Sequence, residues 1–300
     1  MKKPYFGRLM TAMVTLMTNE GAIKYEEEAD FAEWLLANGS DALLVEGTTG
    51  ETPTFTKEEK LGLIKAVCDR IGDRAPIIVG AGSNCTSATI EWCQEIEAKF
   101  PAVDGLLIVG PYYNKPTQEG YYQHFAAIAK AVKLPIIVYN VPGRTGSNIA
   151  PETIARLAKD FENIVAVKEA AGNVAQTATL YRLCPKDFTI YSGDDGLILP
   201  FMAVGAKGLI SVLSNAGGEL LNKVMDAFEA GKIDEAADAN AVMVPVANAM
   251  FMESNPIPIK AAVTKCTPFD AGIPRLPLVP ISAAADAKLE AILKANGMMK

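Results

Sequence analysis

Short apolar runs rich in β-branched residues recur along the chain, and each is followed by a turn and then by a stretch with helical spacing of apolar positions. Eight such runs begin near Leu9, Ala42, Pro76, Gly105, Pro135, Ile164, Phe188 and Gly208. Eight consecutive β-α units are the number that closes a TIM (β/α)8 barrel. A doubly wound sheet would not normally need eight units, and no GxGxxG or P-loop motif supports one. We therefore predict an α/β protein with a TIM barrel.

The stretches between the runs place apolar residues on one helical face, as in helices that pack on a sheet. The predicted helices cover residues 26–37, 57–71, 86–99, 120–132 and 151–159. After the eighth run, helical patterns continue without strands over 219–230, 233–251, 257–266 and 283–295. We therefore predict a barrel over residues 1–218 and a C-terminal helical extension over 219–300. The extension either packs on the barrel or serves in oligomerisation.

Composition excludes several classes of function. The formal net charge of -7 argues against a nucleic-acid partner. No run approaches the roughly 18 apolar residues of a membrane span, so we expect a cytoplasmic protein without a membrane partner. The five cysteines have no CxxC spacing and His124 is the only histidine, which argues against disulfides, a zinc site and a serine hydrolase triad.

Lys168 closes the apolar run 164–167, where an ammonium group is out of place in a buried strand. Burial disfavours the charged form of lysine and lowers its pKa, so the neutral amine can form a Schiff base with a carbonyl compound. The alternative is a surface lysine that pairs with a neighbour such as Glu169. Taken alone, Lys168 leaves both interpretations open.

Polar residues also follow other predicted strands, where the chemistry of a TIM barrel lies. These segments are GTTGE at 47–51, GPYYN at 110–114 and YNVPGRTG at 139–146. Each could be an ordinary turn or surface group. Together they supply donors for a substrate carboxylate, a tyrosine for proton transfer and a guanidinium for a second carboxylate. Two acids in SGDDG at 192–196 would repel a phosphate, so we expect a carboxylate substrate.

The segments GTTGE, PYYNKP, YNVPGRTG, VKEAAGN, SGDDG and NPIPIK, in this order, resemble the dihydrodipicolinate synthase family of pyruvate-dependent Schiff-base aldolases. The resemblance runs from about Gly7 to the C-terminus. It implies a lyase-class enzyme that condenses pyruvate with L-aspartate-4-semialdehyde in the diaminopimelate and lysine pathway, without a metal or organic cofactor. N-Acetylneuraminate lyases are also similar, but they typically have serine for the first threonine of GTTGE and lack the arginine of YNVPGRTG.

The resemblance implies four catalytic residues. Lys168 would form the imine with pyruvate, and Tyr139 would donate and accept protons beside it. Thr48 would link Tyr139 to Tyr113 in a hydroxyl relay. Tyr113 would reach in from a neighbouring subunit, so the resemblance implies at least a dimer and suggests a homotetramer built as a dimer of dimers.

The resemblance also implies the residues that bind the substrates. Thr49, with nearby backbone N–H groups, would hold the carboxylate of pyruvate. Arg144 would bind the carboxylate of the semialdehyde. Gly193 and the carbonyl of Ile210 would border the pocket.

The chain departs from lysine-inhibited relatives at the feedback site. Lys57 and Lys60 stand where some bacterial members carry histidines, and Ala88 stands where a glutamate binds the amine of the inhibitor. Asn84 and Tyr112 are retained from that site. A cationic amino acid beside two lysines without a carboxylate is electrostatically unfavourable. We therefore expect weak or absent inhibition by lysine.

Two other functions remain open from the sequence. The first is another aldolase of the same superfamily, such as an N-acetylneuraminate lyase or a sugar-acid aldolase. The second is a catalytically silent barrel that serves as a binding or structural module. The silent barrel predicts no adduct at Lys168 with any ligand.

Overall fold

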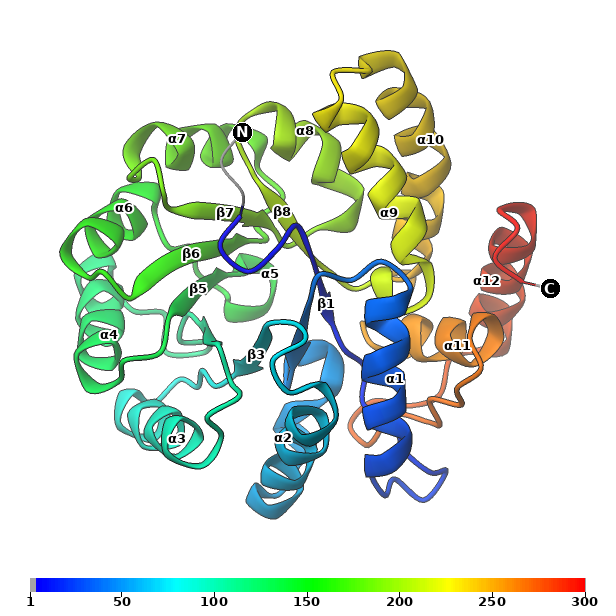
Figure 1. Cartoon of the computed structure of the whole chain (residues 1–300), viewed down its shortest axis with the longest axis horizontal. Coiled ribbons are helices and arrows are strands. Elements are labelled where there is room, and N and C mark those ends of the chain that lie inside the picture. The colour runs from blue at the N-terminus through cyan, green and yellow to red at the C-terminus, as the bar shows by residue number, and fades with distance from the viewer. Residues whose placement is uncertain (1–3, 300) are drawn as a thin grey trace. The chain divides into compact units, whose positions relative to one another are not determined.

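In the computed structural model, which describes residues 4–299, eight parallel strands close a barrel in chain order (Figure 1). The strands are β1 Leu9–Ala12, β2 Ala42–Val45, β3 Ile77–Gly80, β4 Gly105–Val109, β5 Ile136–Asn140, β6 Ile164–Glu169, β7 Thr189–Ser192 and β8 Gly208–Ser211. Each strand lies in one of the eight predicted runs. The TIM barrel is therefore confirmed, and the doubly wound alternative is wrong because an open sheet would have two edge strands.

The apolar runs form strands because both of their faces are covered. Every residue of β2 and of β5 is buried, so neither strand shows an alternation of apolar and polar residues. Parallel strands of this kind are typical of sheets with helices on the outside. A polar side chain at the end of such a strand is therefore held in apolar surroundings.

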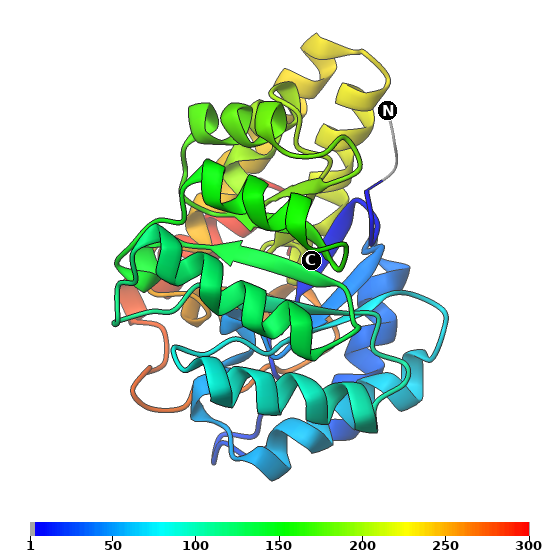
Figure 2. The ribbon, with the colours of Figure 1, turned by 90° about the vertical axis from the view of Figure 1, so that its left-hand side faces the viewer.

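The chain divides into two compact units. The first consists of the N-terminal segment up to Arg8 and of Pro76–Ile210. Figure 2 looks onto its helices, which pack side by side in chain order. They are α3 Thr86–Lys99, α4 Gln118–Ala131, α6 Pro151–Asp160 and α7 Val174–Leu183, with the short helices α5 Pro142–Thr145 and α8 Ile198–Ala203 and the 3-10 turn η3 Asp195–Leu197.

The second unit consists of Leu9–Ala75 and of the chain from Ser211 onwards. Its helices are α1 Tyr25–Ala37, α2 Lys57–Ile71, α9 Ser214–Glu229, α10 Ile233–Ala249, α11 Ile257–Cys266 and α12 Ala283–Ala295, and two 3-10 turns, η1 Thr48–Gly50 and η2 Thr52–Thr54, follow β2. A capping box between Thr56 and Glu59 starts α2, which satisfies two N–H groups of its first turn. The predicted boundary between residues 218 and 219 falls inside α9. The division into a barrel and an extension therefore stays a prediction.

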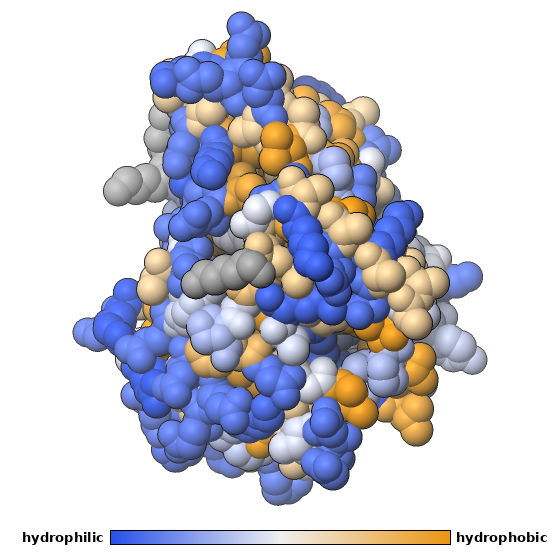
Figure 3. All heavy atoms as spheres, turned by 90° about the vertical axis from the view of Figure 1, so that its right-hand side faces the viewer, coloured by the Kyte–Doolittle hydropathy of each residue, from blue (hydrophilic) through white to orange (hydrophobic). Residues whose placement is uncertain are grey.

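The helices of the C-terminal extension pack against one another, and α9 also packs against β1 and α1 of the same unit, as their apolar faces require. Figure 3 shows hydrophobic side chains between hydrophilic ones on the side that carries these helices. The large apolar side chains that stay exposed in this unit are Ile233, Val242, Phe251, Ile273, Leu276 and Val279. Within residues 4–299, none of the helices combines the length and the apolar composition of a membrane span.

Candidate active site

Lys168 lies in β6, one residue before its end, and only 5% of its surface is exposed. The preceding residues Ala166 and Val167 are fully buried, so the strand carries the lysine into the protein interior. The register of the parallel pair β5–β6 places Tyr139 opposite Lys168. The Lys168 Nζ atom lies 4.6 Å from the centroid of the Tyr139 ring. Lys168 and Tyr139, two of the three predicted catalytic residues in this unit, are therefore in contact.

Burial lowers the pKa of Lys168 to about 8, because the charged amine loses its hydration. Two neighbouring charges act in opposite directions: the Asp195 carboxylate raises this pKa and the Arg144 guanidinium lowers it. No carboxylate forms a salt bridge with Lys168 among the residues that the structure describes. The amine is therefore neutral in a large fraction of molecules near pH 8, which is the state a nucleophilic lysine needs.

Tyr139 and Arg144 come from the end of β5 and from the short helix that follows it. Burial raises the pKa of the Tyr139 hydroxyl to about 12, and the positive charge of Arg144 opposes that increase. Pro142 occupies the first position of α5, where proline fits the helix backbone and loses no hydrogen bond. The same guanidinium thus acts on both Lys168 and Tyr139.

Glu169 is fully buried, but it does not pair with Lys168. Its carboxylate oxygens accept hydrogen bonds from Asn140 Nδ2 at 3.1 and 3.2 Å, from Gln176 Nε2 at 3.0 Å and from the N–H of Ala171 at 2.8 Å. These neutral donors satisfy the carboxylate and hold the chain that follows Lys168. The interpretation of Lys168 as a surface lysine paired with Glu169 is therefore wrong.

Gly193 follows β7 and leaves room for the lysine side chain. A Cβ atom on Gly193 would lie 3.1 Å from both Cε and Cγ of Lys168 and 2.6 Å from the Cβ of Ala170. Only glycine therefore fits against Lys168 without a shift. Ile210, in β8, is fully buried in the same unit.

Thr48, predicted for the hydroxyl relay, and Thr49, predicted for the pyruvate carboxylate, belong to the second unit and follow β2. Thr48 and Thr49 form the turn η1, which is closed by the N–H of Gly50 on the carbonyl of Gly47 at 3.0 Å. Thr49 is buried, and its Oγ1 atom accepts a hydrogen bond from Asn255 Nδ2 at 3.0 Å. The relay from Tyr139 through Thr48 to Tyr113 stays a prediction.

The loop after β4 carries Tyr112 and Tyr113, which are both exposed. Tyr113 has 89% of its surface exposed and adopts a left-handed backbone with φ 72°. Asn114 and Asn84 exchange two hydrogen bonds, from Asn84 Nδ2 to Asn114 Oδ1 at 3.1 Å and from Asn114 Nδ2 to the Asn84 carbonyl at 2.8 Å. Ala88 is exposed in the first turn of α3.

Lys57 and Lys60 lie in the first turn of α2, in the second unit. Glu46, the residue after β2, is buried and adopts a left-handed backbone with φ 58°. Burial raises the pKa of Glu46 to about 8, and the nearby positive charge of Lys60 opposes this shift. Glu46 is therefore mostly protonated at neutral pH, and no motif in the sequence predicts this role for it.

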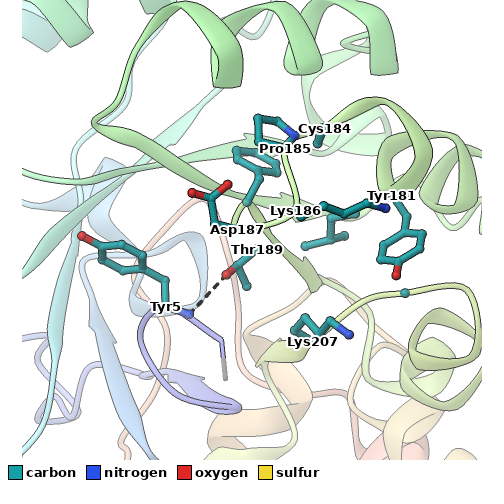
Figure 4. Close-up of a pocket in the computed structure, with 11 residues that line it drawn as sticks. Tyr5, Tyr181, Cys184, Pro185, Lys186, Asp187, Thr189 and Lys207 are labelled. Atoms are coloured by element: carbon teal, nitrogen blue, oxygen red, sulfur yellow. Dashed lines mark hydrogen bonds between the residues drawn. The ribbon is translucent and has the colours of Figure 1, made fainter. Parts of the chain in front are cut away.

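Figure 4 shows a separate cavity of about 120 Å³ in the first unit. It borders Thr189 and Ile190, the first residues of β7, whereas Lys168 lies near the carboxyl end of β6. The ammonium groups of Lys186 and Lys207 lie 4.7 and 6.0 Å from the centroid of the Tyr181 ring. This cavity is therefore not the candidate active site.

The single histidine is part of the packing of the first unit. His124 is buried in α4, and its Nδ1 atom shares a hydrogen bond of 2.9 Å with Thr86 Oγ1. Burial lowers the pKa of its imidazole to about 4. Over residues 4–299, no three His, Cys, Asp or Glu side chains are grouped in a way that could hold a metal ion.

The sequence profile of the Dihydrodipicolinate synthetase family matches residues 5–296. The chain belongs to this family. It is 50% identical over 293 residues to the 4-hydroxy-tetrahydrodipicolinate synthase of Heliobacterium modesticaldum, an alignment that covers 98% of this chain and 96% of the relative. Membership of the family makes the chain an enzyme of the lyase class.

Solved structures of the family have the same fold. The dihydrodipicolinate synthase of Cyanidioschyzon merolae, described with lysine bound, superimposes with a TM-score of 0.95 at 41% identity and covers 99% of this chain and 100% of its own. A variant described as the first monomeric dihydrodipicolinate synthase superimposes with a TM-score of 0.94 at 38% identity, with 98% of each chain covered.

The sequence predicts for Asp195 only that it repels a phosphate. The structure shows that Asp195 is buried and that its charge raises the pKa of Lys168. Asp194, the other acid of this loop, accepts a hydrogen bond from the N–H of Gly196 at 3.0 Å. The sequence cannot show which of the two acids acts on Lys168 and which accepts the hydrogen bond of its own turn, because this depends on the three-dimensional position of each carboxylate.

We expect Gly193→Ala to displace the Lys168 side chain and to lower the free energy of unfolding by about 1–3 kcal/mol, as in other overpacked sites. Gly143→Ala is the matched control, since a Cβ atom there meets no atom within 4 Å and alanine favours the helix α5. Urea unfolding of both variants measures the difference. Equal midpoints for the two variants would show that Gly193 has free space around it.

Proposed function

We propose that this enzyme condenses pyruvate with L-aspartate-4-semialdehyde through a Schiff base on Lys168, the activity for which its 4-hydroxy-tetrahydrodipicolinate synthase relatives are named. The observation that carries the proposal is a buried lysine with a pKa of about 8 in contact with a tyrosine ring. We further propose that this reaction serves the diaminopimelate and lysine pathway and takes place in the cytoplasm.

The proposed reaction begins with the neutral amine of Lys168. It attacks the keto carbon of pyruvate, and loss of water leaves a protonated imine. The iminium withdraws electrons, so a proton leaves the pyruvate methyl group and an enamine forms. The enamine carbon attacks the aldehyde carbon of the second substrate, whose oxygen takes up a proton. The amine of that substrate then displaces Lys168 and closes the ring, which regenerates the free lysine.

Tyr139 fits the proton transfers in these steps. Its ring contacts the Lys168 ammonium, and its high pKa keeps the hydroxyl protonated until a base accepts the proton. We assign Thr49 to the carboxylate of pyruvate and Arg144 to the carboxylate of the semialdehyde, because a guanidinium binds a carboxylate through two parallel hydrogen bonds. Gly193 and Ile210 would border the bound substrates.

We propose that Tyr113 completes the site of a neighbouring subunit through Thr48. The exposure of Tyr113 and its left-handed backbone support this role. The residue is 89% exposed, and burial of its ring against a partner would be favourable. The active unit would then be at least a dimer, and a dimer of dimers is the assembly that we expect.

Incubation with pyruvate and borohydride tests the Schiff base directly. We expect a single reduced pyruvyl adduct by intact mass, located at Lys168 by peptide mapping, and its loss in Lys168→Ala. A wild-type enzyme that forms no adduct would support the silent barrel instead. Formation of the adduct together with release of pyruvate from sugar acids would favour a sugar-acid aldolase.

The pH dependence of adduct formation follows from the pKa of Lys168. Because only the neutral amine reacts, the rate rises with pH and levels off above about 8. Below that pH it falls about tenfold per pH unit. Arg144→Gln removes a charge that lowers this pKa, so its midpoint lies at higher pH. Rates of trapping between pH 6 and 10, with Lys159→Gln as a surface control, measure the shift, and coincident profiles would contradict it.

We propose that lysine inhibits this enzyme weakly or not at all, although one relative is described with lysine bound. The cations Lys57 and Lys60 oppose a cationic ligand, and Glu46 supplies little negative charge because it is mostly protonated at neutral pH. Asn84 and Tyr112 alone would provide neutral contacts.

Synthase assays with L-lysine at up to about 10 mM, which is tenfold above a Kd of about 1 mM, test this proposal. We expect less than a twofold loss of activity for the wild type and measurable inhibition for Ala88→Glu, which restores a carboxylate to the first turn of α3. Inhibition of the wild type at sub-millimolar lysine would refute the proposal.

A further inference from the structure

A second buried lysine lies in the C-terminal extension, and the mechanism does not use it. Lys260, in α11, has only 1% of its side chain exposed. Its Nζ atom donates to Glu51 Oε1 at 2.8 Å, to the Thr15 carbonyl at 3.1 Å and to the Ile273 carbonyl at 3.4 Å. Every proton of the ammonium therefore has an acceptor, and its charge is paired.

Glu51 is the residue that ends the turn η1. It adopts a left-handed backbone with φ 60°, a conformation that a side chain other than glycine takes up only when its surroundings hold it there. Its Oε1 atom binds Lys260, and its Oε2 atom accepts a hydrogen bond from the N–H of Arg275 at 2.8 Å. Both carboxylate oxygens are thus held by residues that follow the eighth strand by about 50 residues or more.

Arg275, also in the extension, binds the segment that follows the turn η1. Its guanidinium pairs with Glu59 through two hydrogen bonds and donates to the carbonyls of Gly21 at 2.8 Å and Thr54 at 3.0 Å. The planar guanidinium also lies over the Phe55 ring, 4.9 Å from its centroid. The segment from η2 to the first turn of α2 is therefore held in place from the C-terminal side.

Two further contacts reach the turn itself. Asn255, just before α11, donates to Thr49 Oγ1 at 3.0 Å, and Thr15 Oγ1 donates to the Gly50 carbonyl at 2.8 Å. The Thr15 carbonyl is in turn one of the acceptors of Lys260. One ammonium group thus connects both sides of the turn.

We propose that Lys260 is a positioning residue for the substrate carboxylate, because its ion pair with Glu51 fixes the turn that carries Thr48 and Thr49. The extension would then form part of the catalytic machinery without touching the substrate. This inference rests on the proposed function, in which Thr49 and neighbouring N–H groups bind pyruvate.

The balance of charges explains why the pair can act in this way. A buried ion pair costs desolvation and adds little net stability, yet it holds a single geometry when all of its hydrogen bonds are made. Glu28 also faces Lys260 and is fully buried, but burial raises its pKa to about 8, so it is mostly neutral at pH 7. Glu51 is therefore the carboxylate that determines where the ammonium lies.

Pyruvate kinetics of Lys260 variants test the proposal. We expect Lys260→Met to raise KM for pyruvate about tenfold while kcat changes less than threefold, as the loss of one to two hydrogen bonds to the turn would require. The midpoint of the pH profile for adduct formation stays at the wild-type value, because the charges that shift Lys168 are unchanged. Lys265→Met is the matched control, since Lys265 lies in the same helix and pairs with Asp286 at 3.1 Å.

The double variant Glu51→Gln/Lys260→Met separates positioning from folding. It removes both buried charges and keeps an oxygen for the N–H of Arg275, so its melting temperature recovers relative to Lys260→Met. The proposal requires that its KM stay raised. A wild-type KM in the double variant, or in a folded Lys260→Met, would overturn the proposal, whereas a wild-type enzyme without a pyruvate adduct would overturn the proposed function instead.

Discussion

The burial of an ammonium group at the end of a strand is the constraint on which this site depends. Loss of hydration lowers the pKa of Lys168, and no salt bridge offsets it within the described chain. The residues around Lys168 fit this buried position. Tyr139 covers the amine with its ring, and Gly193 leaves the space that the side chain occupies. Asp195 and Arg144 then set the remaining balance of charge, so the apolar strand β6 and a few polar residues together produce a reactive amine.

Among residues 4–299, two lysines are buried, and their surroundings differ. Lys168 lies beside an aromatic ring and follows mainly apolar strand residues. These surroundings favour the neutral form of its amine. Lys260 has a carboxylate at 2.8 Å and backbone carbonyls for its remaining protons, so its charge is retained and its position is defined. The same side chain is therefore reactive where hydrogen-bond partners are few and structural where all of its donors are satisfied.

The strands were easier to predict than the short helices. Each strand is a compact apolar run bounded by turn residues, so hydrophobic pattern alone located all eight. The helices α5, α7 and α8 were not predicted. α5 has only four residues, α8 has six apolar residues that continue the turn η3, and α7 buries only two residues, Thr177 and Leu180. Such segments lack a distinct apolar face, and their helical conformation depends on the packing around them.

The sequence by itself determined the barrel, most helix boundaries within a few residues and the family. It also indicated Lys168, because a cation that closes an apolar run is evident without coordinates. Only the tertiary structure decided that Glu169 bonds to Asn140 and Gln176 instead of Lys168, and that Asp195 acts on the amine while Asp194 caps its own turn. It also brought Lys260 to Glu51, 209 positions apart in the chain. Local patterns record which residues are apolar, whereas the direction of each side chain and the pairing of distant charges arise from packing, which no short segment encodes.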